Sequence, residues 1–472
     1  MLFEHQVEGI RFLNLAKKAI LADDMGLGKT RQAILAAANE VGDILVVCPA
    51  SLKENWAREI RGQDIEDTIE IIDGGKRYTY YDGGNRVWTI VNYDVLERYA
   101  EDLKQPIGIY DEAHYIKNLR TNRTKAALKI AKRQEIVYLL TGTPVLNRPE
   151  ELFSLLQAID HKLGKSWYSY VLRYCNGHYR EFRKRVQLPN GAWEVKNIKF
   201  LDTGGASNLD ELAVKINDSY LRRTKAELGD KLPAKIVDTV KVELAPADRQ
   251  KYNTVWDTYI QYLENDPDGV DERKMINAQM TRHLIELGKL KQVVSLGKLD
   301  RIVNDVADIV EQGEKVLVFT QYTETVCQLK EKLQAKKIKS VSLTGSDDMQ
   351  ARTKAVDEIQ KGSTQVFIGN IKAAGVGLTL TAANTVLFAD MEWTPASNQQ
   401  AEDRAHRIGQ PKQVNIHYYI AEKTVDEDIA ELLGVKQQII DKILSGQSGD
   451  SKDITADLIR RILAKNKAKV IH

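Results

Sequence analysis

The chain is poor in cysteine. Its three cysteines, Cys48, Cys175 and Cys327, lie far apart, and no pair of them has the spacing of metal ligands. Nor do they suggest a disulfide framework, which small secreted domains use to stabilise a minimal core. The cysteines therefore argue against a cysteine-ligated metal site and a disulfide-rich secreted domain, and they fit a reducing cytosol.

The chain also lacks an excess of charge and any long apolar run. With 68 basic and 66 acidic residues its net charge is +2, so composition alone does not predict a nucleic-acid partner and any basic surface must be local. No apolar run reaches the roughly 18 residues that a membrane span needs, and the first residues do not resemble a signal peptide. We therefore expect a cytoplasmic protein that does not enter membranes.

What the chain does have is a repeated alternation of short apolar runs with helical patterns. Its 472 residues, 43% of them hydrophobic, are enough for two or three domains with their own cores. Strand candidates lie at 43–49, 87–92, 107–111 and 136–141, and again at 315–320, 340–344, 365–369, 385–390 and 414–420. This pattern predicts an α/β fold with two parallel sheets, each covered by helices on both faces.

The middle of the chain differs in character. Residues 162–200 are basic and aromatic, 236–244 resemble a strand, and 245–295 have a helical pattern. Two interpretations of 162–200 stay open. Its aromatics could fill a helical core with the lysines in solvent. Alternatively, the segment could be a DNA-facing protrusion whose arginines neutralise phosphates and whose aromatics wedge a junction.

The segment 22–30, Ala-Asp-Asp-Met-Gly-Leu-Gly-Lys-Thr, lies between an apolar run and a helical pattern. Strand, glycine turn and helix form the context of a phosphate-binding loop, because N–H groups at a helix N-terminus can cradle phosphate oxygens. Lys29 would reach the β and γ phosphates, and the Thr30 hydroxyl would hold Mg²⁺. Asp23 stands where the general pattern has its first glycine. ATP and Mg²⁺ are therefore the expected cofactors.

A second element is Asp-Glu-Ala-His at 111–114, directly after the strand candidate 107–111. Ligands of open α/β sheets bind at the edge where parallel strands end, so two carboxylates there are well placed for chemistry. Asp111 would hold Mg²⁺ through water, and Glu112 would orient and deprotonate the attacking water. The hydroxyls of Thr141 and Thr143, at another strand end, could link this site to movement.

A third element is the pair Arg404 and Arg407. Spaced three residues apart, they would share one face of a helix. As arginine fingers they would stabilise charge on a transferring phosphoryl group. The alternative is a pair of surface salt bridges with Glu402 and Asp403.

These elements together resemble the Swi/Snf-type ATPases of helicase superfamily two. The first motif of that family is Asp-Glu-Met-Gly-Leu-Gly-Lys-Thr. Residues 23–30 match it except at position 24, where Asp24 replaces Glu. Phe3 and Gln6 resemble its adenine-reading motif. The resemblance implies nucleotide contacts from Gln6, Asp24, Met25, Gly26, Leu27, Gly28, Lys29, Thr30, Gly377, Arg404 and Arg407.

The resemblance also implies DNA contacts. Segments 49–56, 92–94, 315–321 and 375–380 look like the family motifs that grip a DNA backbone or relay to ATP. We expect DNA contacts at Ser51, Leu52, Asn92, Tyr93, Lys372 and Trp393. For Trp393 a packing role is an equal alternative. Thr394 departs from the Asn that the family usually has there.

Segments 141–152, 173–176, 207–212 and 221–235 narrow the resemblance to the HepA-related, annealing-helicase branch. Members of that branch anneal strands and remodel forked DNA rather than unwind it. The resemblance implies two RecA-like lobes with ATP between them, moving as a monomer along double-stranded DNA without reading its sequence. We expect lobe one at 1–160, its basic aromatic insert and its end at 161–244, a helical protrusion at 245–295, lobe two at 296–424 and a helical brace and tail at 425–472.

Two other roles fit the same motor. It could displace DNA-bound protein such as RNA polymerase, although no polymerase-binding extension precedes Phe3. It could also be the motor subunit of a nuclease complex with a separate protein partner, since no nuclease motif is visible. The compact layout suggests a bacterial or viral origin, with the protein associated with the nucleoid.

Overall fold

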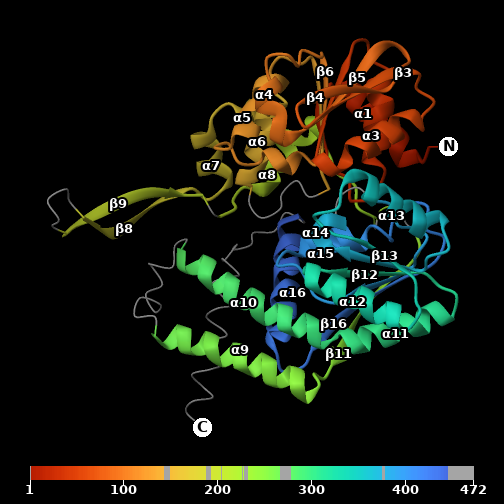
Figure 1. Cartoon of the computed structure of the whole chain (residues 1–472). Helices are drawn as coiled ribbons and strands as arrows, with labels where there is room; N and C mark the ends of the chain where they lie inside the picture. Colours follow the sequence, from red (N-terminus) through yellow and green to blue (C-terminus); the bar gives the residue numbers. More distant parts are fainter. Residues whose placement is uncertain are drawn as a thin grey trace. The chain divides into compact units, whose positions relative to one another are not determined.

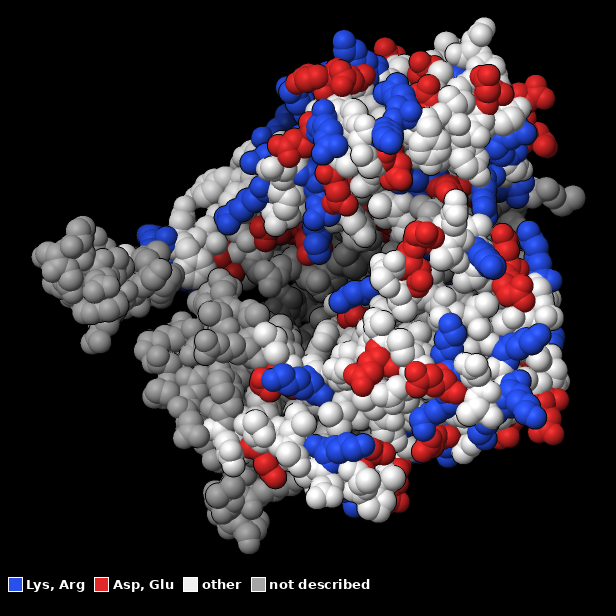
Figure 2. Space-filling view, viewed as in Figure 1, with Lys and Arg blue, Asp and Glu red and all other residues white. Residues whose placement is uncertain are grey.

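A computed structural model describes residues 2–142, 149–187, 193–203, 205–225, 227, 232–265, 278–374 and 378–444. These residues form two compact units, the first within Met1–Glu227 and the second within Leu228–Gln437. Among the described helices, none is long and apolar enough to cross a membrane. On the face drawn in Figure 2, basic and acidic side chains are interspersed over both units, as the near-zero net charge leads one to expect.

The first unit is built on an eight-stranded sheet with the order β10-β1-β7-β6-β2-β5-β3-β4 (Figure 1). All neighbouring strands are parallel except β3 and β4. The strands are β1 Lys18–Leu21, β2 Ile44–Cys48, β3 Asp67–Asp73, β4 Lys76–Tyr81, β5 Gly84–Asn92, β6 Ile107–Asp111, β7 Ile136–Leu140 and β10 Tyr220–Leu221. β2, β6 and β7 are buried along their whole length, as expected for parallel strands covered on both faces.

Helices connect these strands, and their apolar side chains complete the core of the first unit. They are α1 Glu4–Ala16, α2 Lys29–Ala38, α3 Lys53–Arg61, α4 Leu96–Tyr99, α5 Asn122–Ala131, α6 Glu150–Ala158, α7 Trp167–Tyr174 and α8 Leu209–Ile216. Short 3₁₀ helices lie at Ala50–Leu52, Tyr93–Val95, Ala113–Ile116, Lys162–Gly164 and Asn217–Ser219.

The basic and aromatic segment 162–200 consists of a helical part followed by a pair of strands. α7 places Tyr170 and Tyr174 in the core, as the packing interpretation expects. The rest is a separate antiparallel ribbon of β8 His178–Gln187 and β9 Trp193–Asp202, which extends from the first unit in Figure 1. Tyr179 and Phe200, near the base of this ribbon, are exposed. A helical core therefore accounts for only part of the segment.

The second unit contains a six-stranded, all-parallel sheet with the order β11-β16-β15-β12-β14-β13. Its strands are β11 Lys235–Val242, β12 Val316–Thr320, β13 Ser340–Leu343, β14 Val366–Asn370, β15 Thr385–Phe388 and β16 Val414–Ala421. Its helices are α9 Pro246–Asn265, α10 Ala278–Gly297, α11 Leu299–Glu311, α12 Thr323–Ala335, α13 Met349–Lys361, α14 Ile371–Ala374, α15 Pro395–Glu402 and α16 Val425–Leu444.

The expected α/β architecture with two sheets is confirmed, and both sheets are parallel except for the pair β3 and β4. The nine strand candidates of the two sheets lie within a few residues of observed strands. One expected boundary differs from the structure. β11 was placed at the end of lobe one, but it pairs with β16 in the second sheet, so the units change after Glu227 rather than after residue 244. The strands β3 and β4 were not expected, because β4 lies at an edge and is largely exposed.

Candidate functional site

The glycine turn before α2 has the backbone of a phosphate-binding loop. Gly26 and Gly28 have positive φ angles of 86° and 78°, a region that side chains disfavour, and Gly28 is the N-cap of α2. A Cβ atom on Gly28 would also lie 2.3 Å from Gln6 Nε2. Glycine at 28 is therefore required by the turn, and the end of the Gln6 side chain from α1 fills the space beside it. The turn leaves the first N–H groups of α2 without helical partners, as anion binding needs.

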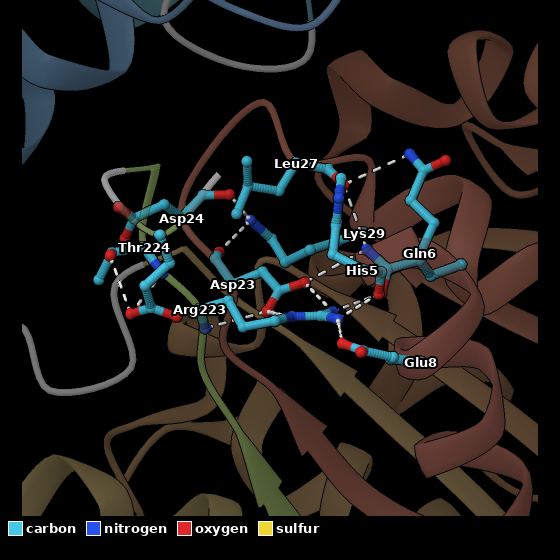
Figure 3. Close-up of polar contacts among 11 residues, drawn as sticks. His5, Gln6, Glu8, Asp23, Asp24, Leu27, Lys29, Arg223 and Thr224 are labelled. Atoms are coloured by element: carbon cyan, nitrogen blue, oxygen red, sulfur yellow. Dashed lines mark hydrogen bonds and ion pairs between the residues drawn. The ribbon is translucent and has the colours of Figure 1, made fainter. Parts of the chain in front are cut away.

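Lys29 lies where such a loop needs its cation. Its Nζ donates hydrogen bonds to the backbone oxygens of Asp23 at 2.6 Å and Asp24 at 3.1 Å (Figure 3). Burial lowers the pKa of Lys29, while the carboxylates of Glu112 and Asp111 are among those that act to raise it. The ammonium group and both sequence-predicted carboxylates thus share one electrostatic environment.

Gly142, between Thr141 and Thr143, packs against the same loop. A Cβ atom on Gly142 would lie 2.7 Å from Met25 Cγ and 3.4 Å from Lys29 Nζ. Its neighbours Thr143 and Pro144 lie outside the described residues, so the proposed role of the Thr143 hydroxyl stays a prediction.

Gln6 of α1 lies beside the loop, as the resemblance implies. Its Nε2 is 3.5 Å from the backbone oxygen of Leu27, and its Oε1 accepts a hydrogen bond from Phe3 N at 3.2 Å. His5 Nε2 lies 3.1 Å from the same Leu27 oxygen. Gln6 is buried, and adenine recognition by its amide stays a prediction.

Asp111, the last residue of β6, is a buried carboxylate. Trp56 Nε1 donates to its Oδ2 at 2.8 Å, and the backbone N of Glu112 donates to its Oδ1 at 2.9 Å. Burial and the neighbouring charge of Glu112 raise the pKa of Asp111 to about 6, against the effects of the Trp56 bond and of Lys29. A carboxylate whose charge is this costly is one that a bound cation would stabilise.

Glu112 follows at the start of a 3₁₀ helix. Its backbone has a φ of 49°, an uncommon conformation for a residue with a side chain and one that recurs at functional sites. Glu112 Oε2 lies 3.2 Å from His114 Nδ1, and both side chains are largely buried. The backbone turn therefore places the carboxylate of Glu112 beside the ring of His114.

The described residues of this site suit Mg²⁺ only if phosphate oxygens supply some of its ligands. Across the described part of the chain, no group of three or more His, Cys, Asp or Glu side chains is arranged to hold a metal ion. Mg²⁺ typically keeps several waters and binds through one or two carboxylates together with substrate phosphates. Asp111 and the partly exposed Thr30 are suited to that mode.

We predict that Asp111→Asn removes a pH-dependent cost from the ligand-free protein. The raised pKa means that the folded protein binds more protons than the unfolded chain between the ordinary pKa of 3.8 and about 6. The cost of the buried charge is therefore absent below pH 4 and fully present above about pH 6. The amide nitrogen of Asn cannot accept one of the two bonds from Trp56 and Glu112, a loss that is the same at every pH. Relative to pH 4, the stability of the variant against wild type should improve by about 1–2 kcal/mol at pH 7.5 in denaturant unfolding. A stability difference that does not change with pH would contradict this electrostatic account.

The two arginines of the second unit do not share a helix face, contrary to the expectation. α15 ends at Glu402, and Arg404 and Arg407 lie in the turns that follow. Arg404 Nη1 donates to the backbone oxygen of Leu378 at 3.2 Å, and Arg407 Nη1 donates to Thr379 Oγ1 at 2.7 Å. The two side chains still converge, because both contact the segment 378–379. Gly377, the expected nucleotide contact just before it, lies outside the described residues.

The alternative salt-bridge role of these arginines is not favoured at Glu402. Its carboxylate is 2.8 Å from Lys235 Nζ and accepts a hydrogen bond from Tyr418 OH at 2.6 Å. These contacts tie Glu402 to the sheet of the second unit.

Several expected DNA contacts are buried, which corrects the prediction for their side chains. Leu52 and Asn92 are only 4% and 7% exposed, and Tyr93 is buried with its hydroxyl donating to the backbone oxygen of Asp111 at 2.7 Å. All three side chains lie in the interior of the first unit. Ser51 is partly exposed and stays a candidate.

In the second unit the two expected DNA contacts differ. Lys372 is exposed, and its Nζ lies 3.1 Å from Glu392 Oε1. Trp393 is partly buried in a cluster with α10, where Lys291 Nζ lies 4.3 Å from the centre of its ring. The packing alternative therefore describes the position of Trp393, while Lys372 stays a candidate for a DNA contact.

Two residues of the site were missed from the sequence. Trp56 holds Asp111, and Arg223 holds Asp23. The replacement of a P-loop glycine by a charged residue was the available signal for the second pair, because a buried aspartate requires a partner.

Comparison with known proteins agrees with this geometry. The SNF2-related domain family matches residues 5–298, and the helicase conserved C-terminal domain family matches residues 297–409. The chain belongs to the SNF2-related family.

Among curated relatives, the mouse protein "DNA annealing helicase and endonuclease ZRANB3" is 34% identical over 466 residues, which cover 94% of this chain and 41% of that protein. The Drosophila melanogaster "SWI/SNF-related matrix-associated actin-dependent regulator of chromatin subfamily A-like protein 1" is 31% identical, with coverage of 94% and 56%. The chain thus spans about two fifths to somewhat over half of these relatives. The predicted resemblance to the annealing-helicase branch is confirmed.

Among solved structures, the "Sulfolobus solfataricus SWI2/SNF2 ATPase core in complex with dsDNA" is 26% identical, with a TM-score of 0.41 and coverage of 96% of this chain and 94% of that chain. This TM-score is too low to support a conclusion about the fold, which rests on the observed sheets and the family matches. The expected bacterial or viral origin is not borne out, since the relatives named above come from animals.

Proposed function

We propose that the chain is an ATP-dependent translocase on double-stranded DNA, which remodels forked or branched DNA and anneals strands without extensive unwinding. One observation carries the proposal. At one edge of the first sheet, Lys29 of a phosphate-type loop shares its electrostatic environment with Asp111 and Glu112, in a chain of the SNF2-related family.

In this proposal the first unit binds ATP. Lys29 Nζ exchanges its bonds to the backbone oxygens of Asp23 and Asp24 for the β and γ phosphates, while the turn at Gly28 presents N–H groups to them. Thr30 and Asp111 would hold Mg²⁺, which would offset charge on the phosphate oxygens. Glu112 accepts a proton from the attacking water.

The second unit contributes charge stabilisation in the same proposal. Arg404 and Arg407 are anchored on the backbone and side chain of 378–379, so their guanidinium groups need little ordering when they meet a phosphate. Hydrolysis would then be coupled to lobe movement, which is how contacts to DNA phosphates could step along a duplex.

The DNA substrate is proposed from the relatives, one of which is named a DNA annealing helicase. Contacts to phosphates position a protein but carry no sequence information, so binding should be non-specific. Each neutralised phosphate should add roughly 0.9 to the log–log slope of affinity against salt. Lys372, Ser51 and the ribbon of β8 and β9 are the described candidates for such contacts.

The test is steady-state ATP hydrolysis at fixed low salt, with no nucleic acid, single-stranded DNA, plain duplex, forked duplex or duplex RNA. We expect strong stimulation by duplex DNA and a larger one by forks. Equal stimulation by forks and plain duplex would leave a general duplex motor and contradict fork preference. No stimulation by any DNA would overturn the proposed function.

A further inference from the structure

The last residues of the first unit run beside the phosphate-binding loop. β10 pairs in parallel with β1, and the pairing continues beyond the ends of both strands. Ala22 N donates to the backbone oxygen of Leu221 at 2.7 Å, and Asp24 N donates to that of Arg223 at 2.9 Å. The segment that precedes the second unit in the chain is therefore hydrogen-bonded to the residues at which the loop begins.

The side chain of Arg223 reinforces this contact. Its Nε donates to Asp23 Oδ1 at 3.0 Å and its Nη2 to Asp23 Oδ2 at 2.5 Å, a two-pronged contact visible in Figure 3. The backbone N of Arg223 adds a third bond to Asp23 Oδ1 at 3.1 Å. Asp23 is 0% and Arg223 9% exposed, so water and salt screen this ion pair far less than a surface pair.

The same guanidinium group connects two helices to the loop. Its Nη2 donates to Gln32 Oε1 of α2 at 2.8 Å, and its Nη1 donates to the backbone oxygen of His5 in α1. Gln32 Nε2 in turn donates to Asp23 Oδ2 and to the backbone oxygen of Leu27, both at 3.2 Å. One buried network therefore joins α1, the loop and α2, with Arg223 at its centre.

The position of the loop lysine depends on this network. Lys29 Nζ is held by the backbone oxygens of Asp23 and Asp24. Arg223 fixes the side chain of Asp23, and Lys225 N donates to Asp24 Oδ2 at 3.1 Å. A displacement of the segment 222–225 must therefore move the two oxygens that hold Lys29.

We propose that Arg223 is a positioning residue of the phosphate-binding loop, which couples the chain leading to the second unit with nucleotide binding. The inference rests on the proposed function, because it requires that the loop binds ATP. It also explains the departure from the general P-loop pattern. Asp23 replaces the first glycine because the loop needs a buried anion as the anchor for Arg223.

The test replaces Arg223 by lysine. This change keeps the charge but removes the planar fork that contacts both oxygens of Asp23. We expect the dissociation constant of a fluorescent ATP analogue, measured without DNA, to rise at least ~10-fold, as for other residues that orient a ligand-binding group. The ratio of duplex-stimulated to unstimulated ATP turnover should fall toward one. That ratio is the readout that a merely structural role would leave unchanged.

The matched control is Arg86→Lys, which removes another two-pronged arginine–aspartate contact of the first unit, from Arg86 Nε at 2.7 Å and Nη2 at 2.6 Å to Asp67 Oδ2. Neither quantity should change there by more than about 2-fold. If Arg223→Lys does not fold, Asp23→Asn serves as the second variant, because it keeps the side-chain shape and removes the anion; the same two losses are expected.

Three results would contradict the inference in distinguishable ways. Unchanged affinity and stimulation in a folded variant would overturn it while leaving the ATPase in place, provided that the wild type hydrolyses ATP. A loss of affinity with an unchanged stimulation ratio would overturn the coupling. A wild-type protein that binds no nucleotide would overturn the proposed function and this inference together.

Discussion

Glu112→Gln is expected to reduce DNA-stimulated ATP hydrolysis by about 10²–10⁴-fold, the range typical of a lost general base. The amide cannot accept a proton from water, but it keeps the shape of the side chain beside His114. Binding of ATP and of DNA should therefore be retained. Single-turnover hydrolysis, together with nucleotide and duplex binding, measures all three quantities.

A second loss-of-function variant and a surface control help to interpret that result. Lys29→Ala should also abolish hydrolysis, but through loss of the phosphate contact, so ATP binding should fall with it. Glu101→Gln alters a carboxylate that lies on the surface with Lys129 and Arg133, and should leave turnover unchanged. Normal turnover in Glu112→Gln would sink the assignment of Glu112 as the base.

Arg407→Ala is expected to slow hydrolysis by ~10³-fold or more, the effect of removing an arginine finger. Its guanidinium group is held by Thr379 Oγ1 at 2.7 Å, so it is already ordered before nucleotide arrives. The rate constant of a single turnover at saturating ATP and duplex is the measurement, because it isolates chemistry from binding.

The control is Arg301→Ala on the exposed face of α11. Arg301 pairs with Asp305 at 2.9 Å, an arrangement of the same kind as the alternative salt-bridge role of Arg407. That variant should change the rate constant little. A loss of only a few-fold in Arg407→Ala would reduce Arg407 to a structural residue that supports the segment 378–379.

The buried parallel strands could be predicted because burial on both faces leaves a continuous apolar run. β2, β6 and β12 are of this kind, and each is buried along its length. β4 and the ribbon of β8 and β9 lack this signal, because an edge strand or an isolated ribbon needs no apolar run. Their pairing is decided by the chain that folds beside them.

The local geometry of the glycine turn could be predicted for a related reason. A phosphate-binding loop is local, since Gly26, Gly28 and Lys29 must follow one another in the chain to shape one turn. The exposure of the residues expected to contact DNA could not be predicted in this way. Whether Leu52 or Tyr93 faces solvent depends on elements that the local sequence does not contain, and both side chains are buried.

The sequence by itself determined the two α/β units, the phosphate-binding loop and the carboxylates Asp111 and Glu112, because periodicity and short motifs act over a few residues. Only the tertiary structure decided that Arg223, 200 residues further along the chain, anchors Asp23, and that Trp56 holds Asp111. Contacts at that separation follow from strand order, since β10 joins the sheet beside β1. No local sequence pattern identifies the partner of Asp23, although a buried aspartate requires one.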